Sequence, residues 1–281
     1  MVHPADAVTA LFVPGDRPDR FAKAAAADPD LVVLDLEDAV PPEAKDAALE
    51  AVLSALAARG SLCALVRVNA VGTATHAGEV AALAGLAAHP GHGLIGVLLP
   101  KAEDPAVVAG LVSSLASSGS AREGGGDLAV VPLVESALGV LRAFELASVS
   151  GVTRLAFGGL DFTLDISADL DSAAVAQARA QLVIASRAAG IAAPLDSPST
   201  DVRDLERVLA SARAGRSAGF GGQLCIHPAQ LAAVRAGFAP SAAEVEWARG
   251  VIGGEGGAVQ VDGRMVDRPL VERARRILRS R

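Results

Sequence analysis

The chain has 281 residues, of which 51% are apolar and 20% are charged. This composition excludes an intrinsically disordered protein, and the length accommodates one large α/β domain or two smaller ones. The 32 acidic residues outnumber the 25 lysines and arginines, and the net charge of −7 argues against general binding to nucleic acid or to anionic membranes.

The sequence also lacks the segments that direct a protein into or across a membrane. No apolar run approaches the ~20 residues of a transmembrane helix, and the first residues lack the basic and apolar regions of a secretory signal. The two cysteines, Cys63 and Cys225, lie within apolar runs, which predicts buried thiols and not a disulfide. We therefore expect a cytoplasmic protein.

Short apolar runs alternate with longer amphipathic segments along most of the chain. The runs predict strands at 10–13, 31–36, 64–68, 95–99, 128–134, 154–157, 191–195 and 222–226. The segments between them predict helices at 18–27, 43–58, 78–88, 104–117, 136–149, 173–189, 202–214 and 229–237. Strands this short and this apolar are typical of a parallel sheet that is buried on both faces.

Eight strands and eight helices within about 240 residues match the size of a (β/α)8 barrel. A doubly wound open sheet is the competing architecture, and it would carry a glycine-rich phosphate-binding turn after its first strand. Residues 13–18, Val-Pro-Gly-Asp-Arg-Pro, contain one glycine. We therefore predict an α/β TIM barrel that forms a catalytic domain over residues 1–238.

Two stretches depart from this alternation. Residues 117–127 are rich in glycine and serine, which predicts a flexible surface loop. Residues 239–281 predict a C-terminal extension with a helix at 242–251, a hairpin at 258–266 with Asp-Gly at its turn, and a basic helix at 269–281. Because a minimal barrel does not need this extension, it is either a packing element or a lid or exchange arm.

The chemistry of a barrel of this kind lies at the C-terminal ends of its strands. The polar residues and glycines at the ends of the apolar runs are Asp35, Glu37, Asp38, Arg67, Asn69, Lys101, Glu103, Glu135, Gly158, Gly159, Asp161, Asp196 and His227. Acidic groups would thus converge from four neighbouring strands around one arginine. Without a cation, their repulsion would shift their pKa values by several units. This convergence predicts a bound divalent cation.

The ligand types indicate which cation. Carboxylates without paired His or Cys favour a hard ion, and Mg²⁺ takes one or two carboxylates beside water and substrate. Glu135 and Asp161, on adjacent predicted strands, are the best pair of ligands. Gly158 and Gly159 would let the backbone approach a ligand closely and would expose amide donors beside Asp161. A lone carboxylate at a strand end is otherwise a helix cap or a surface ion pair.

Three other polar side chains have two interpretations each. Arg67 is suited to hold a substrate carboxylate with its planar fork, or it pairs with Asp35 within the protein. Lys101 could form a Schiff base, but no sign of desolvation surrounds it, which favours an electrostatic partner of the acidic cluster. His227 is interpreted as a structural ring that is hydrogen-bonded under the barrel rim, and not as a base.

Eight motifs in order extend over essentially the whole chain. They are LFVPGDRPDRFAKA (11–24), LDLEDAV (34–40), VRVN (66–69), LPKAE (99–103), PLVES (132–136), AFGGLDF (156–162), CIHP (225–228) and MVDRP (265–269). Together they closely resemble the citrate lyase β-subunit-like proteins, which include malyl-CoA and citramalyl-CoA lyases, within the HpcH/HpaI aldolase superfamily. Eight motifs in order are specific to the family and much less specific to a substrate.

The resemblance implies a Mg²⁺-dependent TIM barrel, a homotrimer or hexamer, that makes or breaks a C–C bond beside an acyl thioester. Mn²⁺ is the expected substitute for Mg²⁺. The resemblance also implies that Glu135 and Asp161 are the metal ligands and that Arg67 holds the substrate carboxylate. The segment that receives the keto acid is matched by Gly158, Gly159, Leu160 and Asp161.

The resemblance assigns roles to three more acids. Glu37 and Asp38 look like the acids that hold metal-bound waters and Arg67. Asp267 matches the acid that related lyases bring into a neighbouring subunit's site on a C-terminal lid, where it would protonate the enolate carbon. The extension at 239–281 is therefore expected to pack on a neighbouring subunit.

A basic group surrounds the start of the first predicted helix. Arg17, Arg20 and Lys23 lie there, and Pro18 occupies the first helical position. Because phosphates bind at helix N-termini, these side chains are predicted contacts for the phosphates of CoA. The alternative is a solvated basic face.

The leading hypothesis is a Mg²⁺-dependent C–C lyase. It would act on a 3-hydroxyacyl-CoA thioester of the malyl-, citramalyl- or citryl-CoA type, release acyl-CoA and a keto acid, and carry synthase or thioesterase activity as a side reaction. One alternative is a subunit of a citrate lyase complex that uses a carrier-bound citryl thioester. Another is a CoA-independent pyruvate aldolase.

Overall fold

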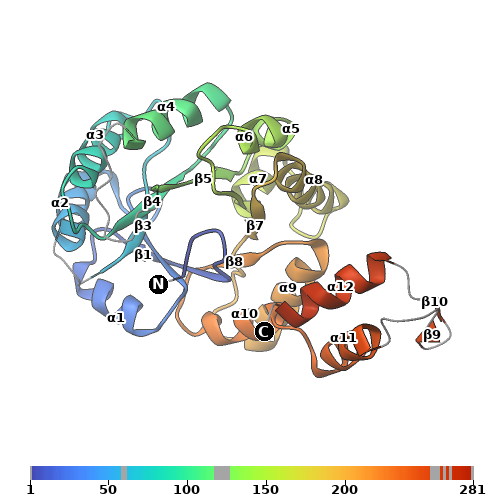
Figure 1. Ribbon diagram of the computed structural model, residues 1–281. Helices are drawn as coiled ribbons and strands as arrows, with labels where there is room; N and C mark the ends of the chain where they lie inside the picture. The colour runs from blue at the N-terminus through green and yellow to red at the C-terminus, as the bar shows by residue number, and fades with distance from the viewer. Residues whose placement is uncertain are drawn as a thin grey trace.

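The computed structural model describes residues 2–57, 62–116, 127–253, 260–261, 264–265 and 268–279. Eight parallel strands form a closed barrel in which each strand pairs with its neighbours in sequence order (Figure 1). Pairing of Thr9–Leu11 in the first strand with Gln223–Cys225 in the last closes the barrel. The predicted TIM barrel is therefore confirmed, and the chain does not form an open doubly wound sheet.

The strands of the barrel are short and mostly buried. They are β1 (Thr9–Pro14), β2 (Leu31–Asp35), β3 (Ala64–Arg67), β4 (Leu94–Leu99), β5 (Ala129–Val134), β6 (Arg154–Phe157), β7 (Ala192–Asp196) and β8 (Gly222–Cys225). Every residue of β2, β4, β5, β6 and β8 is buried. A sheet covered on both faces has this pattern, which explains why the runs do not alternate with polar residues.

Helices connect the strands on the outside of the barrel. They are α1 (Phe21–Ala26), α2 (Lys45–Ala57), α3 (His76–Ala87), α4 (Pro105–Ala116), α5 (Ala137–Leu141), α6 (Ala143–Ala147), α7 (Gly159–Ile166), α8 (Ala173–Ala189), α9 (Leu205–Ala218) and α10 (Gln230–Phe238). Two short 3-10 turns, η1 (Pro18–Arg20) and η2 (Pro42–Ala44), precede α1 and α2. None of the helices in the described ranges is long and apolar enough to cross a membrane.

The core consists of two layers of apolar side chains. Neighbouring residues along a strand divide between them: Val33 belongs to the smaller cluster, whereas Val32 and Leu34 belong to the larger one. This division follows from the alternation of side chains along a strand, with one set directed into the barrel and the other toward the helices. The smaller cluster fills the interior, so the barrel is packed and is not a pore.

The helices after β5 and β6 differ from the predicted ones. The predicted helix at 136–149 is two short helices, α5 and α6, which are separated at Arg142, where φ is −98° and ψ is 12°. The Arg142 side chain donates a hydrogen bond to the carbonyl oxygen of Glu103 at 3.2 Å, which fixes this break. The sequence did not predict α7, because the paired glycines before it are typical of a loop.

A buried arginine closes the N-terminal end of the barrel. Arg154, the first residue of β6, is 1% exposed. Its guanidinium donates hydrogen bonds of 2.5–3.0 Å to the backbone carbonyl oxygens of Pro4, Ala7 and Ala193. Burial lowers the pKa of Arg154 to about 10. Carbonyl dipoles from the N-terminal segment and from β7 thus hold this charge.

The C-terminal extension lies beside α9 and α10 (Figure 1). It contains α11 (Ala242–Gly253), the antiparallel strands β9 (Gln260–Val261) and β10 (Arg264–Met265), and α12 (Arg268–Arg279). The predicted order of helix, hairpin and helix is confirmed. The Gly- and Ser-rich stretch that was predicted as a surface loop lies, except for Asp127, outside the described residues.

The two extension helices have a small apolar core of their own, and α11 begins with a capping box. The core contains Val245, Ala248, Val251, Ala274 and Ile277. At the start of α11, the backbone N–H of Ser241 donates to the Glu244 carboxylate at 2.8 Å, and the N–H of Glu244 donates to the Ser241 hydroxyl at 3.2 Å. This exchange satisfies amides that the first turn of a helix leaves without partners. Glu244 also accepts a hydrogen bond from Arg216 of α9, which ties the extension to the barrel.

Candidate active site

Arg67, the last residue of β3, lies among three carboxylates at the C-terminal ends of the strands. Its Nε and Nη2 donate to the two oxygens of Asp35 at 2.7 and 2.6 Å. Its Nη1 lies 2.9 Å from Glu37 Oε2 and 3.8 Å from Asp38 Oδ2. The pairing with Asp35 that the sequence left open is therefore present, and it fixes the guanidinium plane at the barrel mouth.

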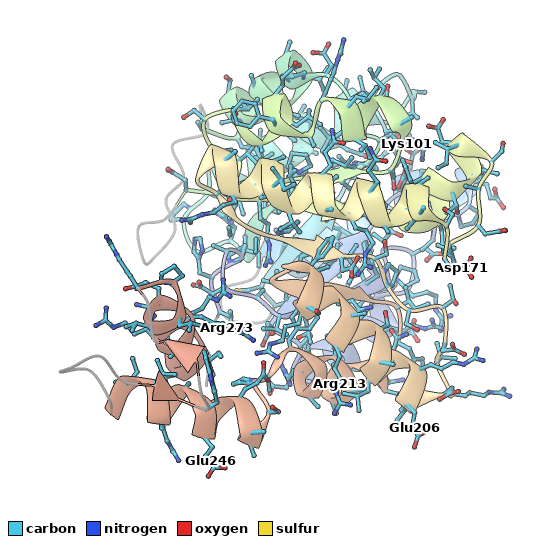
Figure 2. The ribbon with its side chains drawn as sticks, turned by 90° about the vertical axis from the view of Figure 1, so that its right-hand side faces the viewer. Lys101, Asp171, Glu206, Arg213, Glu246 and Arg273 are labelled. Carbon is cyan, nitrogen blue, oxygen red and sulfur yellow. The ribbon has the colours of Figure 1, made fainter. Side chains whose placement is uncertain are left out.

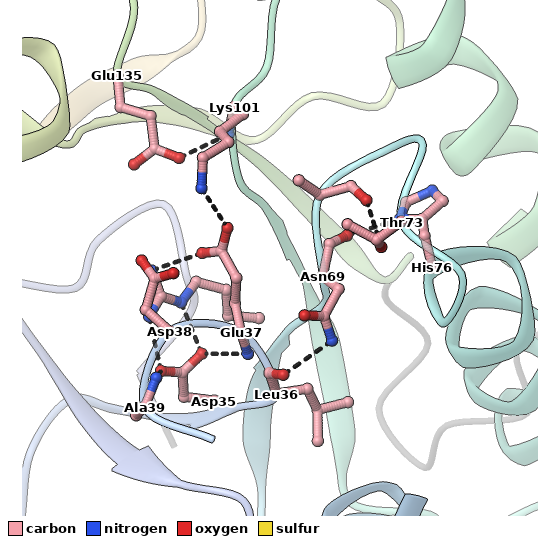
Figure 3. Close-up of polar contacts among 12 residues, drawn as sticks. Asp35, Leu36, Glu37, Asp38, Ala39, Asn69, Thr73, His76, Lys101 and Glu135 are labelled. Carbon is pink, nitrogen blue, oxygen red and sulfur yellow. Dashed lines mark hydrogen bonds and ion pairs between the residues drawn. The ribbon is translucent and has the colours of Figure 1, made fainter. Parts of the chain in front are cut away.

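Lys101 connects two of the predicted site acids. Its Nζ donates to Glu37 Oε1 and its backbone N–H donates to Glu135 Oε1, both at 2.7 Å (Figure 3). Burial alone would lower the pKa of Lys101, but the hydrogen bond and the negative charge of Glu37 outweigh it and raise that pKa. The side chain is thus an ammonium partner of the acidic cluster, as predicted, and is unsuited to act as a Schiff-base nucleophile.

Glu135 follows β5 directly and is 3% exposed. A Cβ atom added to Gly158 would lie 2.5 Å from Glu135 Oε2, so only glycine leaves room for this carboxylate. Burial, together with the negative charges of Glu37 and Asp161, raises the pKa of Glu135 to about 8, although the Lys101 amide opposes this rise. The negative charge of Asp161 thus acts on Glu135, and the role of the two acids as ligands of one cation stays a prediction.

The acidic residues around Glu135 fit a divalent cation. Glu37 Oε2 is buried without a hydrogen-bond partner in the described structure, although Arg67 lies at ion-pair distance from it. In the part of the chain that the structure describes, no three His, Cys, Asp or Glu side chains gather as a metal-binding group. A pair of carboxylates with water and substrate at the remaining positions suits Mg²⁺, and Glu135 and Asp161 stay the predicted pair.

The helix α7 presents backbone amides beside this carboxylate pair. Asp161 lies in its first turn, and Gly158 stands at the N-cap position without a capping side chain. Ser197, which follows β7, supplies the missing cap: it accepts the N–H of Gly159 at 2.8 Å and donates to the carbonyl oxygen of Phe157 at 3.0 Å. Among the described residues, the N–H groups of Leu160 and Asp161 have no acceptor, so they can receive an anion.

Two residues that hold this region were not identified as functional from the sequence. Ser197 forms a tertiary contact, and only its place beside Asp196 at a predicted strand end could have indicated it. Glu79 is 2% exposed and accepts hydrogen bonds of 2.7 and 2.5 Å from the backbone and side-chain nitrogens of Asn69. Asn69 in turn donates to the carbonyl oxygen of Leu36 at 2.8 Å, which joins the ends of β2 and β3. A single glutamate within an alanine-rich apolar helix was the available signal.

The predicted CoA contacts lie apart from the acidic cluster. Arg17, Arg20 and Lys23 are all exposed on η1 and α1. Arg17 pairs with Asp19 at 2.9 Å, and in the described structure none of the three basic side chains makes a hydrogen bond or ion pair with the acidic cluster. Exposure suits both a phosphate contact and a solvated face, so the assignment stays a prediction.

The remaining predicted residues have different outcomes. His227 is exposed and its Nδ1 accepts the backbone N–H of Ala229 at 3.1 Å, so the ring is hydrogen-bonded but does not lie beneath the rim. The expected burial was wrong, because His227 begins a tight turn, in which the N–H of Gln230 donates to the His227 carbonyl oxygen at 3.0 Å, and its ring is left exposed. Cys225 is buried and Cys63 is half-buried, and both are free thiols. Asp267 lies outside the described residues.

Comparisons with known proteins agree with this geometry. The chain is 36% identical over 279 residues to the citrate lyase subunit beta-like protein of Mycobacterium tuberculosis strain H37Rv. This match covers 96% of this chain and 93% of that protein. It is 31% identical over 283 residues to a (3S)-malyl-CoA thioesterase of Cereibacter sphaeroides strain ATCC 17025 (95% of this chain, 92% of that protein). It is 28% identical over 284 residues to human mitochondrial citramalyl-CoA lyase (94% and 82%).

A solved structure and a family model extend the similarity to the fold. The crystal structure of protein CitE from M. tuberculosis in complex with magnesium, acetoacetate and coenzyme A matches with a TM-score of 0.81 and 34% identity over 98% of both chains. The family model of the HpcH/HpaI aldolase/citrate lyase proteins matches residues 9–228. The predicted resemblance is confirmed: this chain is a carbon–carbon lyase of the HpcH/HpaI aldolase/citrate lyase family.

Proposed function

We propose that this protein is a Mg²⁺-dependent lyase that cleaves a 3-hydroxyacyl-CoA thioester into an acyl-CoA and a keto acid. The observation that carries the proposal is the juxtaposition of the buried Glu135 with Asp161 and with the free amides at the start of α7. The similar CitE structure holds magnesium, acetoacetate and coenzyme A, which supports a metal ion, a keto acid and a CoA thioester as the bound groups here.

Glu135 and Asp161 would hold the ion, and Mn²⁺ would replace Mg²⁺ on the same oxygen ligands. When bound, Mg²⁺ lowers the pKa of the substrate hydroxyl and stabilises negative charge on oxygen. Glu37 and Asp38 would orient the waters around the ion and hold Arg67 in place. Placing the reacting groups in fixed positions in this way is a large part of the catalytic effect.

The chain's own donors would hold the keto acid. The N–H groups of Leu160 and Asp161 and the guanidinium of Arg67 would bind its carboxylate, while Gly158 and Gly159 keep the approach open. In the cleavage direction an acid–base group of the site takes the proton of the hydroxyl, whose oxygen becomes the carbonyl oxygen of the keto acid. The C2–C3 bond breaks, and its electrons form the enolate of the acyl-CoA. Fixed donors at the positions where charge develops stabilise this step.

The enolate carbon must then receive a proton. We assign this step to Asp267 of the C-terminal extension, acting in the site of a neighbouring copy. The extension helices α11 and α12 of one chain lie beside α9 and α10 (Figure 1), whereas the acidic cluster lies at the ends of β2, β3 and β5 and at the start of α7. The CoA phosphates would contact the exposed side chains of Arg17, Arg20 and Lys23, and Arg17 would exchange its ion pair with Asp19 for a phosphate.

A homotrimer or hexamer is part of the proposal. Large apolar side chains are exposed on the helices next to the α7 amides, and these helices are α5, α6, α7 and α8. The exposed residues are Leu138, Leu141, Phe144, Leu160, Leu164 and Ile184, between 42% and 79% accessible. Several large apolar side chains exposed on neighbouring helices are typical of a subunit interface. A second copy on this face would bring its extension near the site.

The experiment that tests the function is a substrate screen. Purified protein with Mg²⁺ is given (S)-malyl-, citramalyl-, citryl- and β-methylmalyl-CoA, and release of keto acid and of free CoA is followed separately. Keto acid formed together with acyl-CoA identifies the lyase, whereas free CoA without C–C cleavage identifies a thioesterase, the activity named for one relative. The proposal fails if none of the four thioesters is cleaved, or if 4-hydroxy-2-oxo acids are cleaved equally well without CoA.

A further inference from the structure

A large groove lies at the end of the barrel opposite the candidate active site. It has a volume of about 1,140 Å³, and residues at the N-terminal ends of the strands, such as Asp6, Asp30 and Phe220, line its floor. The ends of α9 and α10 form one wall and α12 forms the other. Figure 2 labels Arg213 on the barrel side and Arg273 on the extension. The proposed chemistry at the strand C-termini does not use this groove.

The groove is strongly basic although the whole chain carries a net charge of −7. Among the residues that the structure describes, its lining contains six arginines and three acids, namely Arg213, Arg216, Arg235, Arg273, Arg276 and Arg279 with Asp6, Asp30 and Glu244. Two of these acids form ion pairs with arginines of the lining: Glu244 with Arg216 at 3.0 Å and Asp30 with Arg235 at 3.1 Å. Arginines thus outnumber acids by three among the described lining residues.

These charges lie on both walls. On α12, the lining residues are Arg273, Arg276, Ile277 and Arg279, and Arg273 and Arg276 are neighbours, three residues apart, on the helix surface. Arg213 of α9 lines the opposite wall. Like charges that face each other across a gap repel, and an anion between them converts this repulsion into attraction.

We propose that this groove binds an anion that carries two or more phosphate groups, at a site separate from the candidate active site. Arginine forks match phosphate oxygens in pairs. Each phosphate carries about −1.5 to −2 charges near pH 7, so two phosphates balance the excess of three. The volume accommodates a ligand of nucleotide size, since ordinary ligand pockets measure roughly 300–1,000 Å³.

The chain contains its own reporter for this site. Trp247 of α11 is the only tryptophan and the chain has no tyrosine. The guanidinium of Arg273 lies over the Trp247 ring, 5.1 Å from its centre. An anion that draws Arg273 into the groove removes a cation from the ring face and changes the tryptophan emission.

The experiment titrates the full-length protein with inorganic pyrophosphate while tryptophan emission is recorded. We expect a saturable change that sodium chloride at matched ionic strength does not produce. The double variant Arg213→Ala/Arg279→Ala should bind pyrophosphate at least ten-fold more weakly, and Arg213→Lys/Arg279→Lys should recover part of the affinity. Arg187→Ala, an exposed arginine on α8, is the matched control and should bind as the parent does. Circular dichroism verifies that each variant is folded.

A second arm identifies the source of the phosphates. If coenzyme A displaces pyrophosphate and moves the emission in the same way, the phosphates belong to CoA; if it does not, they belong to a free polyphosphate or nucleotide, and either result supports the site. An affinity that is unchanged in the Arg213→Ala/Arg279→Ala variant would overturn the proposal. So would a response that salt reproduces, or one that is abolished by Arg20→Ala/Lys23→Ala at the predicted CoA contacts. These outcomes are independent of lyase activity.

Discussion

Two buried arginines lie at opposite ends of the same barrel, and their surroundings differ. Arg67 at the mouth faces Asp35, Glu37 and Asp38; burial would lower its pKa, but these carboxylates raise it. Arg154 at the base is bound to backbone carbonyl oxygens, and burial lowers its pKa. Carboxylates hold Arg67 through hydrogen bonds and ion pairs, whereas Arg154 is hydrogen-bonded to backbone carbonyl groups and the negative charge of Asp6 adds a smaller contribution.

The difference indicates that the mouth of the barrel serves catalysis and that its base serves stability. At the mouth, the described acidic residues outnumber the cationic side chains Arg67 and Lys101 even when Glu135, with its pKa of about 8, is protonated, so the cluster remains negative and attracts a metal ion. The acidic residues are Asp35, Glu37, Asp38, Glu135 and Asp161. At the base, the carbonyl groups that surround Arg154 belong to the N-terminal segment and to β7, and the arginine joins them. Changes at the mouth should therefore alter turnover, and changes at the base should alter stability.

The largest effect should come from removing the carboxylates that hold the metal. We expect Glu135→Gln and Asp161→Asn each to lower Mg²⁺-dependent C–C cleavage by about 10³-fold, equivalent to about 4 kcal/mol of transition-state stabilisation. Both variants should remain folded, because a neutral amide removes the repulsion between the acidic side chains and the cost of burying a charge. Keto acid release and calorimetric Mg²⁺ binding measure the effect, and full activity in either variant with excess chelator present would contradict it.

Arg154→Met should show the reverse behaviour. Loss of the guanidinium leaves buried carbonyl oxygens without donors, and we expect the free energy of unfolding to fall by about 3 kcal/mol. Urea denaturation measures this loss, with Arg187→Met on the exposed face of α8 as the control. The kcat of the folded fraction should stay within two-fold of the parent value. A large drop in kcat without loss of stability would remove the distinction between the two ends.

Ser197→Ala tests whether keto acid binding at the barrel mouth depends on the cap that Ser197 provides for α7. Without this hydroxyl the Gly159 amide and the Phe157 carbonyl lose their partner, and a cavity of about 350 Å³ behind the turn leaves it room to shift. We expect keto acid binding to weaken about ten-fold, or about 1.4 kcal/mol, with Mg²⁺ affinity unchanged. Ser199→Ala in the same loop is the control. Equal losses of metal and keto acid binding would indicate a general structural defect instead.

The smallest expected effect is a pH dependence of stability that comes from Glu244, near the base of the barrel. The hydrogen bond from Arg216, followed by that from the Ser241 amide, lowers the pKa of Glu244 from 4.5 to about 2. A carboxyl with a lowered pKa adds stability above its unfolded value, and this stability is lost as the pH falls from 4.5 toward 2. The difference in melting temperature between the parent and Glu244→Gln should therefore shrink across this interval. Glu246→Gln, exposed on the same helix, should show no such trend.

The barrel and the acidic cluster were predictable from the sequence for a physical reason. Parallel strands buried on both faces are short apolar runs, and their C-terminal ends meet at one edge, so Glu135, Asp161 and Arg67 could be grouped without a structure. The cap that Ser197 provides for α7 and the hydrogen bonds of Arg154 at the base of the barrel could not be predicted in this way. Their partners lie 38 to 150 residues away and are backbone atoms, which leave no signature in side-chain patterns.

The backbone conformation of Lys101 is unfavourable for any residue except glycine. Lys101 is one of the few non-glycine residues in the described ranges with a positive φ, at 49°, a conformation that costs a lysine about 1 kcal/mol or more. A glycine would adopt this conformation freely, but it would remove the ammonium that Glu37 meets. Selection for thermal resistance alone would therefore favour glycine at this position, and selection for turnover would favour lysine.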